Sequence, residues 1–249
     1  MFATKLHRQP LPLDDATMIT VHHLENSRSQ RVLWLLEELG LPYKVKRYAR
    51  DRKTLMAPPE LKQVHALGKS PAITDHAADG DITVAESGAI IEYLLDAHAH
   101  SPEQGRLRPA AGTPERRQFS YWLHFAEGSA MPYLVMKLVF DQVRNAPVPF
   151  FIKPIVKGVA DKVTQSFLMP NITQQLAFIE QTLAQQPWFA GPEFTAADVQ
   201  MSYPLEAASE RVGLGTSHPH IAAWLQRIHA RPAYQRALAQ GGPYKAVPG

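Results

Sequence analysis

The sequence contains no cysteine among its 249 residues. Disulfide bonds, thiolate metal sites and a cysteine nucleophile are therefore excluded, so any thiol in its chemistry must come from a ligand. No apolar run approaches the ~18 to 20 residues that a membrane-spanning helix needs, and the most apolar helical segment, 131–140, contains Lys137. The N-terminus also lacks the apolar core and cleavage site of a secretion signal. These absences predict a soluble, cytoplasmic protein without a membrane span.

Other classes of protein are excluded by charge and by missing motifs. The 26 Lys and Arg residues nearly balance the 23 Asp and Glu residues, and no basic block stands out, which argues against a nucleic-acid partner. The GxGxxG fingerprint of dinucleotide-binding folds is absent. The eleven histidines show neither HExxH spacing nor a nearby acidic third ligand, so we expect no functional metal site.

The pattern of apolar residues divides the chain into unlike halves. Residues 1–17 form a polar, proline-containing arm, and residues 18–100 alternate strand and helix signals in the order βαβαββα. Strands are expected at 18–24, 43–48, 71–75 and 81–86, and helices at 27–42, near 59–67 and at 86–99. Residues 101–114 have the composition of a linker, and residues 115–249 have helical patterns only. The expected helices span about 114–143, 160–186, 196–211, 218–230 and 232–240, with 146–154 separating the first two.

The first candidate site is "ENSRS" at 25–29, where the first strand meets the first helix. Asn26, Ser27 and Ser29 are good N-cap residues, so helix capping is one explanation. The other is that unpaired N–H groups and the positive end of the helix face an anionic ligand, with a hydroxyl donating to a thiolate.

The second candidate site is Pro71, which follows Gly68, Lys69 and Ser70 where a strand begins. Proline gives a sheet no N–H, and a trans proline at the first position of a strand is the ordinary explanation. A cis peptide bond would instead turn the backbone of Ser70 outward. Its N–H and C=O groups would then be available to an extended, peptide-like ligand.

The third and fourth candidates stand where helices begin. Glu86 and Ser87 either cap the helix that follows or bind a free amino-acid group, with Glu86 taking the ammonium and Ser87 the carboxylate. Thr195 and Asp198 have the spacing of a capping box ahead of a buried helix. We assign Thr195 and Asp198 to folding and not to catalysis.

Taken in order, these segments resemble the soluble glutathione S-transferase family over nearly the whole chain after residue 17. The resemblance rests on the serine region after the first strand, "GKSPAI", "ESGAIIEYL", the helical second half and "FTAADV". The segments "NSRSQRVLWLLEELGLPY", "RDRKTLMAPPELKQVHALGKSPAI" and "YWLHFAEGSAMP" are most similar to the fungal and bacterial branch that includes yeast glutathione transferase I.

The resemblance implies an α/β thioredoxin-like domain followed by an all-helical domain. Pro71 would be a cis-proline whose neighbour Ser70 pairs with the cysteinyl backbone of glutathione. Glu86 and Ser87 would hold the γ-glutamyl group, and Lys69, together with Lys53, would neutralise the glycyl carboxylate. The cleft against the helical domain would bind the electrophile, with a lining that comprises Tyr121, His124, Phe125, Met131, Tyr133 and Leu134. Members are usually homodimers, with the 86–97 helix and the first long helix at the interface.

The catalytic group departs from the family pattern. Many members use a tyrosine on the first strand, and residues 18–27 contain none. Alignment of the following helix puts Asn26 at the serine or cysteine position of other classes, with Ser27 beside it. We favour Ser27 because a neutral hydroxyl can donate to sulfur, and Asn26 competes through its side-chain amide.

The sequence therefore predicts an enzyme that conjugates glutathione to small apolar electrophiles. Glutathione is expected as a co-substrate and no cofactor is expected. Two alternatives stay open. One is glutathione-dependent peroxidase or disulfide-bond reductase chemistry, in which two glutathione molecules replace a protein cysteine. The other is a non-catalytic binding protein, because fold does not fix function.

Overall fold

The structure is a computed structural model that describes residues 18–77, 79–242 and 244; the predicted arm, 1–17, lies outside them. Its N-terminal half is a four-stranded sheet with strand order β2-β1-β3-β4. The strands are β1 (Ile19–Leu24), β2 (Tyr43–Tyr48), β3 (Ala72–Ala77) and β4 (Gly80–Ala85). β1 pairs parallel with β2 and antiparallel with β3, and β3 pairs antiparallel with β4. The predicted thioredoxin-like arrangement is confirmed.

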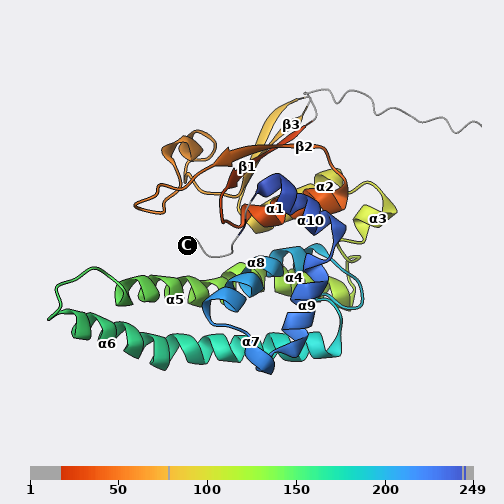
Figure 1. Cartoon of the computed structure of the whole chain (residues 1–249). Helices are drawn as coiled ribbons and strands as arrows, with labels where there is room; N and C mark the ends of the chain where they lie inside the picture. The colour runs from red at the N-terminus through yellow and green to blue at the C-terminus, as the bar shows by residue number, and fades with distance from the viewer. Residues whose placement is uncertain (1–17, 78, 243, 245–249) are drawn as a thin grey trace, which may run out of the picture.

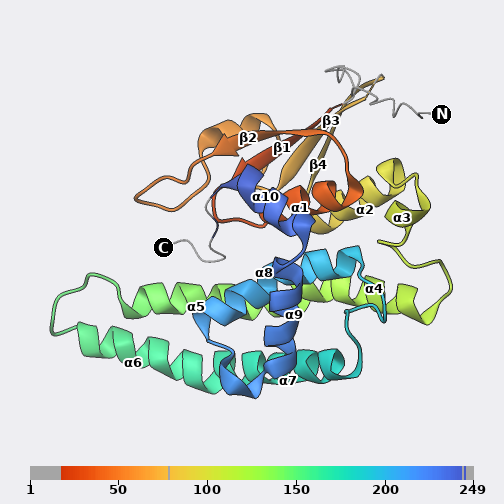
Figure 2. The ribbon, with the colours of Figure 1, turned by 45° about the vertical axis from the view of Figure 1, so that its right-hand side comes forward.

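Two helices of this half lie between the sheet and the rest of the molecule (Figures 1 and 2). They are α1 (Ser29–Leu39) and α2 (Ser87–His98). α1 ends at Gly40, whose φ of 64° gives the left-handed conformation of a helix C-cap. The helix predicted near 59–67 is a short 3₁₀ helix, η2 (Pro59–Gln63). The segment predicted to be a linker contains the one-turn helix α3 (Pro102–Gly105), capped by Ser101.

The described part of the C-terminal half is helical apart from its loops and one isolated β-bridge between Trp188 and Gly191. Its first long helix runs through α4 (Pro114–Phe125), the π-helical turn η3 (Ala126–Ala130) and α5 (Met131–Arg144). Its second runs through α6 (Lys153–Val163), the π-helical turn η4 (Thr164–Leu168) and α7 (Met169–Gln185). The remaining helices are α8 (Ala196–Arg211), α9 (Pro219–His229) and α10 (Pro232–Gly241). α10, the last described helix, returns to pack on α1 of the N-terminal half (Figure 2).

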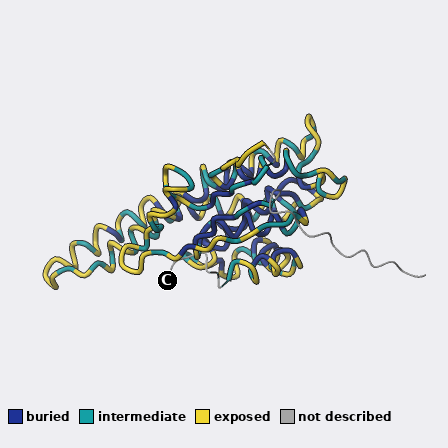
Figure 3. Tube along the Cα trace, turned by 90° about the horizontal axis from the view of Figure 1, so that it is seen from above, coloured by how far each residue is buried: buried dark blue, intermediate teal, exposed yellow. Residues whose placement is uncertain are grey.

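The start of the second long helix corrects the sequence prediction. We expected this helix to begin at about 160, after a segment at 146–154 that separates it from the first, but it begins at Lys153. Pro154 lies in its first turn, where an N–H group has no partner within the helix and proline is tolerated. α5 and α6 consequently extend as a long helical pair, and their far end projects from the body of the molecule (Figure 3).

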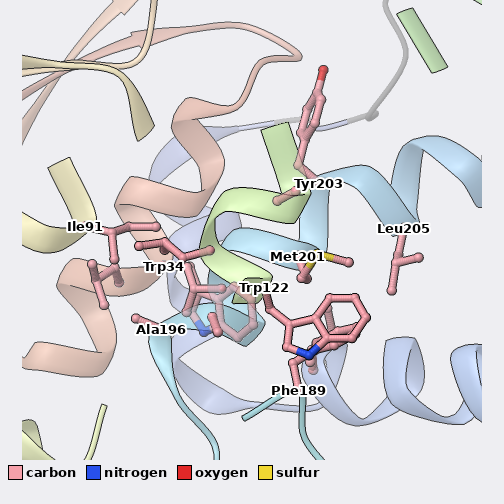
Figure 4. Packing of buried hydrophobic residues seen from close by; sticks show 14 of the residues in the cluster. Trp34, Ile91, Trp122, Phe189, Ala196, Met201, Tyr203 and Leu205 are labelled. Atoms are coloured by element: carbon pink, nitrogen blue, oxygen red, sulfur yellow. The ribbon is translucent and has the colours of Figure 1, made fainter. Parts of the chain in front are cut away.

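The hydrophobic core is continuous across the two halves. Trp34 of α1, Trp122 of α4 and Trp224 of α9 are each at most 1% exposed, and they belong to one cluster of buried residues. Figure 4 shows Trp34 and Ile91 from the N-terminal half beside Trp122, Met201 and Phe189 from the helical half. This shared core fixes how the two halves face one another, and therefore fixes any site between them.

The predicted capping box at the start of α8 is confirmed. Thr195 and Asp198 bond reciprocally, and the Asp198 side chain is completely buried. Its carboxylate accepts hydrogen bonds from the backbone N–H groups of Phe189 and Thr195, each at 3.0 Å, and from the indole N–H of Trp224 at 3.1 Å. Asp198 therefore joins the start of α8 to α9 and to the preceding loop.

We predict that Asp198→Asn lowers the free energy of unfolding by about 2 to 4 kcal/mol, because an amide nitrogen cannot accept the hydrogen bonds that one carboxylate oxygen accepts. Urea unfolding measures the change. The control is Glu103→Gln, which converts a carboxylate to an amide on the exposed face of α3. A loss below about 0.5 kcal/mol in Asp198→Asn would show that the hydrogen bonds of Asp198 contribute little to the stability of the helical half.

Candidate functional site

A pocket of about 250 Å³ lies where the starts of α2 and β3 and the residue before α1 meet η3 of the helical half. It contains all the predicted glutathione-binding residues except Lys53. Its lining is Arg28, His65, Leu67, Lys69, Ser70, Pro71, Ala85, Glu86, Ser87 and Glu127. Segments that are far apart in the sequence therefore form one concave and largely polar site.

The Ser70–Pro71 peptide bond is cis, as the resemblance implies. The Ser70 side chain holds this loop against β1. Its hydroxyl donates to the C=O of His22 at 2.9 Å and accepts from the N–H of Leu24 at 3.3 Å. The serine side chain therefore serves the fold, which leaves the backbone of Ser70 as the part that can serve a ligand.

The start of α2 presents a carboxylate and a hydroxyl to the pocket. Glu86 has a φ of 71° and a ψ of 125°, a backbone conformation that residues other than glycine rarely adopt. Ser87, in the first turn, is 3% exposed, and its hydroxyl accepts a hydrogen bond from the Gln200 amide of α8 at 3.3 Å. Strained backbone conformations of this kind cluster at functional sites.

The pocket also contains an ion cluster that the sequence did not predict. Arg28 Nε donates to both carboxylate oxygens of Glu127, each at 3.0 Å, and Arg31 Nη2 donates to one of them. Arg31 is 1% exposed and also donates through Nη1 to the C=O of Gln200 at 2.7 Å. Burial opposes ionisation of Glu127, but the charges and hydrogen bonds of Arg31 and Arg28 outweigh it, so the pKa of Glu127 is lowered.

The sequence held one indication of this cluster. Arg31 stands directly before the apolar run that forms the buried face of α1, where an arginine needs a buried partner. The identity of that partner had no local signal, because Glu127 is on another domain.

Ser27, the favoured catalytic residue, is outside the pocket lining. It is 4% exposed, and its Oγ lies 2.7 Å from the Oγ of Ser29 and accepts from the Ser29 N–H at 3.2 Å. Ser29 Oγ in turn lies 2.9 Å from Nδ1 of His23. Burial, followed by the charge of Arg47, lowers the pKa of His23 to about 4, so the imidazole is neutral at physiological pH.

Asn26 and Lys53 also lie outside the lining of the pocket. Asn26 has a φ of 47°, and its C=O accepts from Arg50 Nη2 at 3.4 Å. Lys53 is exposed on the loop between β2 and η2, where its N–H donates to Asp51 at 3.0 Å. The catalytic role of Asn26 and the carboxylate-binding role of Lys53 stay predictions.

The predicted electrophile-site residues are divided between the core and the surface. Phe125, Met131 and Leu134 are buried in the core, whereas Tyr121 and His124 are exposed. Tyr133 is half-buried, with its ring centroid 5.7 Å from that of Phe167. None of the six lines the pocket described above, and their role in binding an electrophile stays a prediction.

Two further searches concern the described part of the chain only. It holds no group of three His, Asp or Glu side chains arranged to bind a metal ion. None of its helices is both long enough and apolar enough to cross a membrane.

Fold and pocket together define the class of protein: a thioredoxin-like domain with a cis-proline pocket, joined to a helical domain that closes one side of it. Two family models match, "Glutathione S-transferase, N-terminal domain" over residues 27–97 and "Glutathione S-transferase, C-terminal domain" over residues 139–232. Glutathione S-transferase 3 of Schizosaccharomyces pombe is 36% identical over 217 residues, which cover 87% of this chain and 85% of the relative. Glutathione S-transferase 1 of Saccharomyces cerevisiae is 33% identical, with coverage of 91% and 98%. The chain belongs to the glutathione S-transferase family.

Other matches add solved structures and a second named activity. A glutathione S-transferase of Actinobacillus pleuropneumoniae is 31% identical, with a TM-score of 0.69 and coverage of 90% of this chain and 93% of that one. Glutathione transferase URE2P6 of Phanerochaete chrysosporium, solved with oxidized glutathione, is 25% identical, with a TM-score of 0.68 and coverage of 90% and 96%. Disulfide-bond oxidoreductase YfcG of Escherichia coli is 26% identical, with coverage of 89% and 94%.

We predict that His23→Asn makes stability less dependent on pH between about 6.5 and 4. The pKa of His23 is about 4 in the folded chain against a usual value of 6.5. An unfolded chain therefore binds a proton in this window that the folded chain does not bind, and wild-type stability is lost as the pH falls through it. The asparagine side chain of the variant has no such proton to bind.

Urea unfolding at several pH values measures the effect as a difference between variant and wild type. The difference is the relevant quantity because two other groups titrate in the same window. Burial lowers the pKa of His22 to about 4, which acts with the same sign as His23, and raises the pKa of Asp198 to about 6, which acts with the opposite sign. His100→Asn, at an exposed position, is the control. Equal pH dependence for wild type and His23→Asn would contradict the prediction.

Proposed function

We propose that this glutathione transferase binds glutathione in the pocket beside Pro71 and transfers it to small apolar electrophiles. Glutathione would be its co-substrate, with no cofactor. The observation that carries the proposal is that the Ser70–Pro71 loop and the Glu86–Ser87 pair open into one pocket. The relative from Phanerochaete chrysosporium, whose structure contains oxidized glutathione, supports a ligand of this chemistry.

The charges of the pocket are complementary to the tripeptide. Glutathione carries one ammonium group and two carboxylates. Glu86 would accept hydrogen bonds from the ammonium, the hydroxyl and amide of Ser87 would bind the adjacent carboxylate, and Lys69 would neutralise the glycyl carboxylate. The backbone of Ser70 would pair with the cysteinyl residue between these ends, as a strand is added to a sheet edge.

A second candidate function is reduction of peroxides or disulfides. The match to a disulfide-bond oxidoreductase favours it, and the chain has no cysteine, so both reducing thiols would come from glutathione. One hydroperoxide and two glutathione molecules would give an alcohol, water and glutathione disulfide. Turnover of an aryl halide compared with that of an organic hydroperoxide separates this reaction from conjugation. A chain that binds glutathione and turns over neither substrate would be a binding protein.

We also propose a homodimer and a cytoplasmic location. α5 and α6 leave apolar side chains open to solvent, and single-chain proteins rarely expose a continuous apolar surface. These are Val135, Met136, Val139, Val143, Ile155 and Val159, each between 37% and 67% exposed. α5 continues the long helix at which the family resemblance puts the interface. The cytoplasm is the compartment that keeps glutathione reduced.

We predict that Glu86→Gln weakens glutathione binding about 10-fold or more, because a hydrogen bond to a charged group contributes about 1.5 to 3 kcal/mol. Isothermal titration calorimetry measures the affinity. Glu103→Gln, on exposed α3, removes the same charge away from the pocket and is the control. Equal affinity in the two variants would remove Glu86 from the binding site, and a wild type that does not bind glutathione would refute the proposed function.

We predict that Val139→Glu shifts the protein from dimer to monomer, because a buried interface does not tolerate an unpaired carboxylate. Light scattering after size-exclusion chromatography measures the mass. Thr173→Glu, at an exposed position of α7, is the matched control and should leave the dimer intact. A wild-type monomer, or a dimer that Val139→Glu leaves unchanged, would contradict the proposed interface.

A further inference from the structure

The hydroxyl of Ser27 is bonded to buried neighbours outside the lining of the pocket. Its Oγ accepts from the Ser29 N–H at 3.2 Å and lies 2.7 Å from the Oγ of Ser29. Ser29 Oγ lies 2.9 Å from His23 Nδ1 and donates to the C=O of Leu24 at 3.3 Å. Ser27 is 4% exposed and does not line the pocket, so its hydroxyl is not presented to a ligand there.

Arg28, the residue after Ser27, differs from it because its side chain lines the pocket. That side chain is 31% exposed. Its Nε donates to both oxygens of Glu127, and its terminal nitrogens, Nη1 and Nη2, have no hydrogen-bond partner among the described residues. The guanidinium carbon lies 5.3 Å from the centre of the Tyr203 ring. The guanidinium is thus held on two sides while its terminal donors are available to a ligand.

The ion cluster carries a net positive charge. Two guanidinium groups, of Arg28 and Arg31, share the single carboxylate of Glu127, so one positive charge is left uncompensated. Arg31 is buried and donates to Gln200, and therefore Arg28 is the member of the cluster that brings this charge to the pocket. The other charged or titratable groups that line the pocket are Lys69, Glu86 and His65.

The place of Arg28 in the fold matches the expected place of the sulfur. Arg28 stands immediately before α1, whose N-terminal end is positive. It lines the same pocket as Ser70, the residue proposed to pair with the cysteinyl backbone. A cation beside a thiol lowers the thiol pKa by about 1 to 3 units, because it stabilises the charged form.

We infer that Arg28 is the catalytic residue that stabilises the thiolate of bound glutathione, and that Glu127 is the positioning residue that holds its guanidinium at the pocket. The inference rests on the proposed function, since it requires glutathione in this pocket. The thiol releases its proton to solvent, and the sulfur electron pair then forms the bond to the electrophile while the leaving group departs with its own pair. Arg28 stays protonated throughout.

The inference is tested by the pKa of the bound thiol. This pKa is measured from the ultraviolet absorbance of the thiolate during a pH titration of the glutathione complex. In the wild type it should lie about 1 to 2 units below the free value of about 8.5. Arg28→Gln should return it to within about half a unit of the free value, with Arg28→Lys in between. At neutral pH, kcat/KM should fall about 10-fold in Arg28→Gln, in line with the lost thiolate fraction.

Two controls separate the sulfur from the carboxylates of glutathione. Lys69→Gln removes one positive charge from the same pocket and should weaken glutathione binding with little change in the thiol pKa. S-Methylglutathione has no ionisable thiol, so Arg28→Gln should change its affinity less than threefold. If Arg28→Gln instead weakens S-methylglutathione as strongly as glutathione, Arg28 binds a carboxylate and the inference is wrong. Arg117→Gln, on an exposed part of α4, controls for general charge effects.

Glu127→Gln tests the positioning role of Glu127 through the direction in which it shifts the thiol pKa. Removal of a negative charge by itself would lower the thiol pKa further, whereas release of Arg28 from the pocket wall would raise it. We expect a rise, and a fall would overturn the role of Glu127. Circular dichroism and urea unfolding confirm that each variant is folded.

The outcomes also distinguish this inference from the proposed function. A wild type that does not bind glutathione would refute the function. A wild type that binds glutathione with an unshifted thiol pKa, or an Arg28→Gln variant that keeps the lowered pKa, would refute the inference alone. A return to the free value in Ser27→Ala but not in Arg28→Gln would establish Ser27 in its place.

Discussion

The ion cluster of Arg28, Arg31 and Glu127 is the interaction on which the arrangement of the molecule around its pocket depends. It joins the first helix of the thioredoxin-like half to the π-helical turn of the helical half, and Arg31 extends it to α8 through the C=O of Gln200. A buried guanidinium without its carboxylate would cost several kcal/mol, so the two halves are constrained to meet with these groups in register. The pocket lies beside that contact and shares Arg28 and Glu127 with it.

The two halves of the molecule contribute different groups to the pocket. The thioredoxin-like half supplies the groups proposed to bind the tripeptide: the Ser70 backbone, the Glu86 carboxylate and the Ser87 hydroxyl. The helical half supplies Glu127 and supports Ser87 through the amide of Gln200. A displacement of the helical half would therefore alter the peptide site and the charge beside it together.

The two serines near the start of α1 show how local chemistry depends on distant contacts. Ser27 and Ser29 are both plausible donors to a ligand when only their neighbours in sequence are considered. The return of α10 against α1 places Gly241 beside the His23 ring, whose Nδ1 lies 2.9 Å from the Oγ of Ser29. Ser29 in turn contacts Ser27, and both serines are buried outside the lining of the pocket.

Much of the peptide pocket could be predicted from the sequence, because each part is local. The Lys69–Ser70–Pro71 loop and the Glu86–Ser87 pair each place their groups through the geometry of a few adjacent residues. The antiparallel pairing of β3 with β4 then brings the two segments to the same end of the sheet. The capping box of Thr195 and Asp198 was predictable for the same reason. The alternating patterns of 18–100 and the helical patterns beyond determined the fold class. Local geometry and chain order are properties that the sequence carries directly.

Tertiary structure alone decided the rest. The partner of Arg31 lies on another domain, and only the packing of η3 against α1 selects Glu127. The predicted electrophile residues were drawn from one long helix, and its packing against α8 decides which of its faces is buried. Phe125, Met131 and Leu134 lie in the core, while Tyr121 and His124 are exposed. The sequence specifies which groups are adjacent along the chain, but which face of a helix meets a partner depends on the packing of the whole molecule.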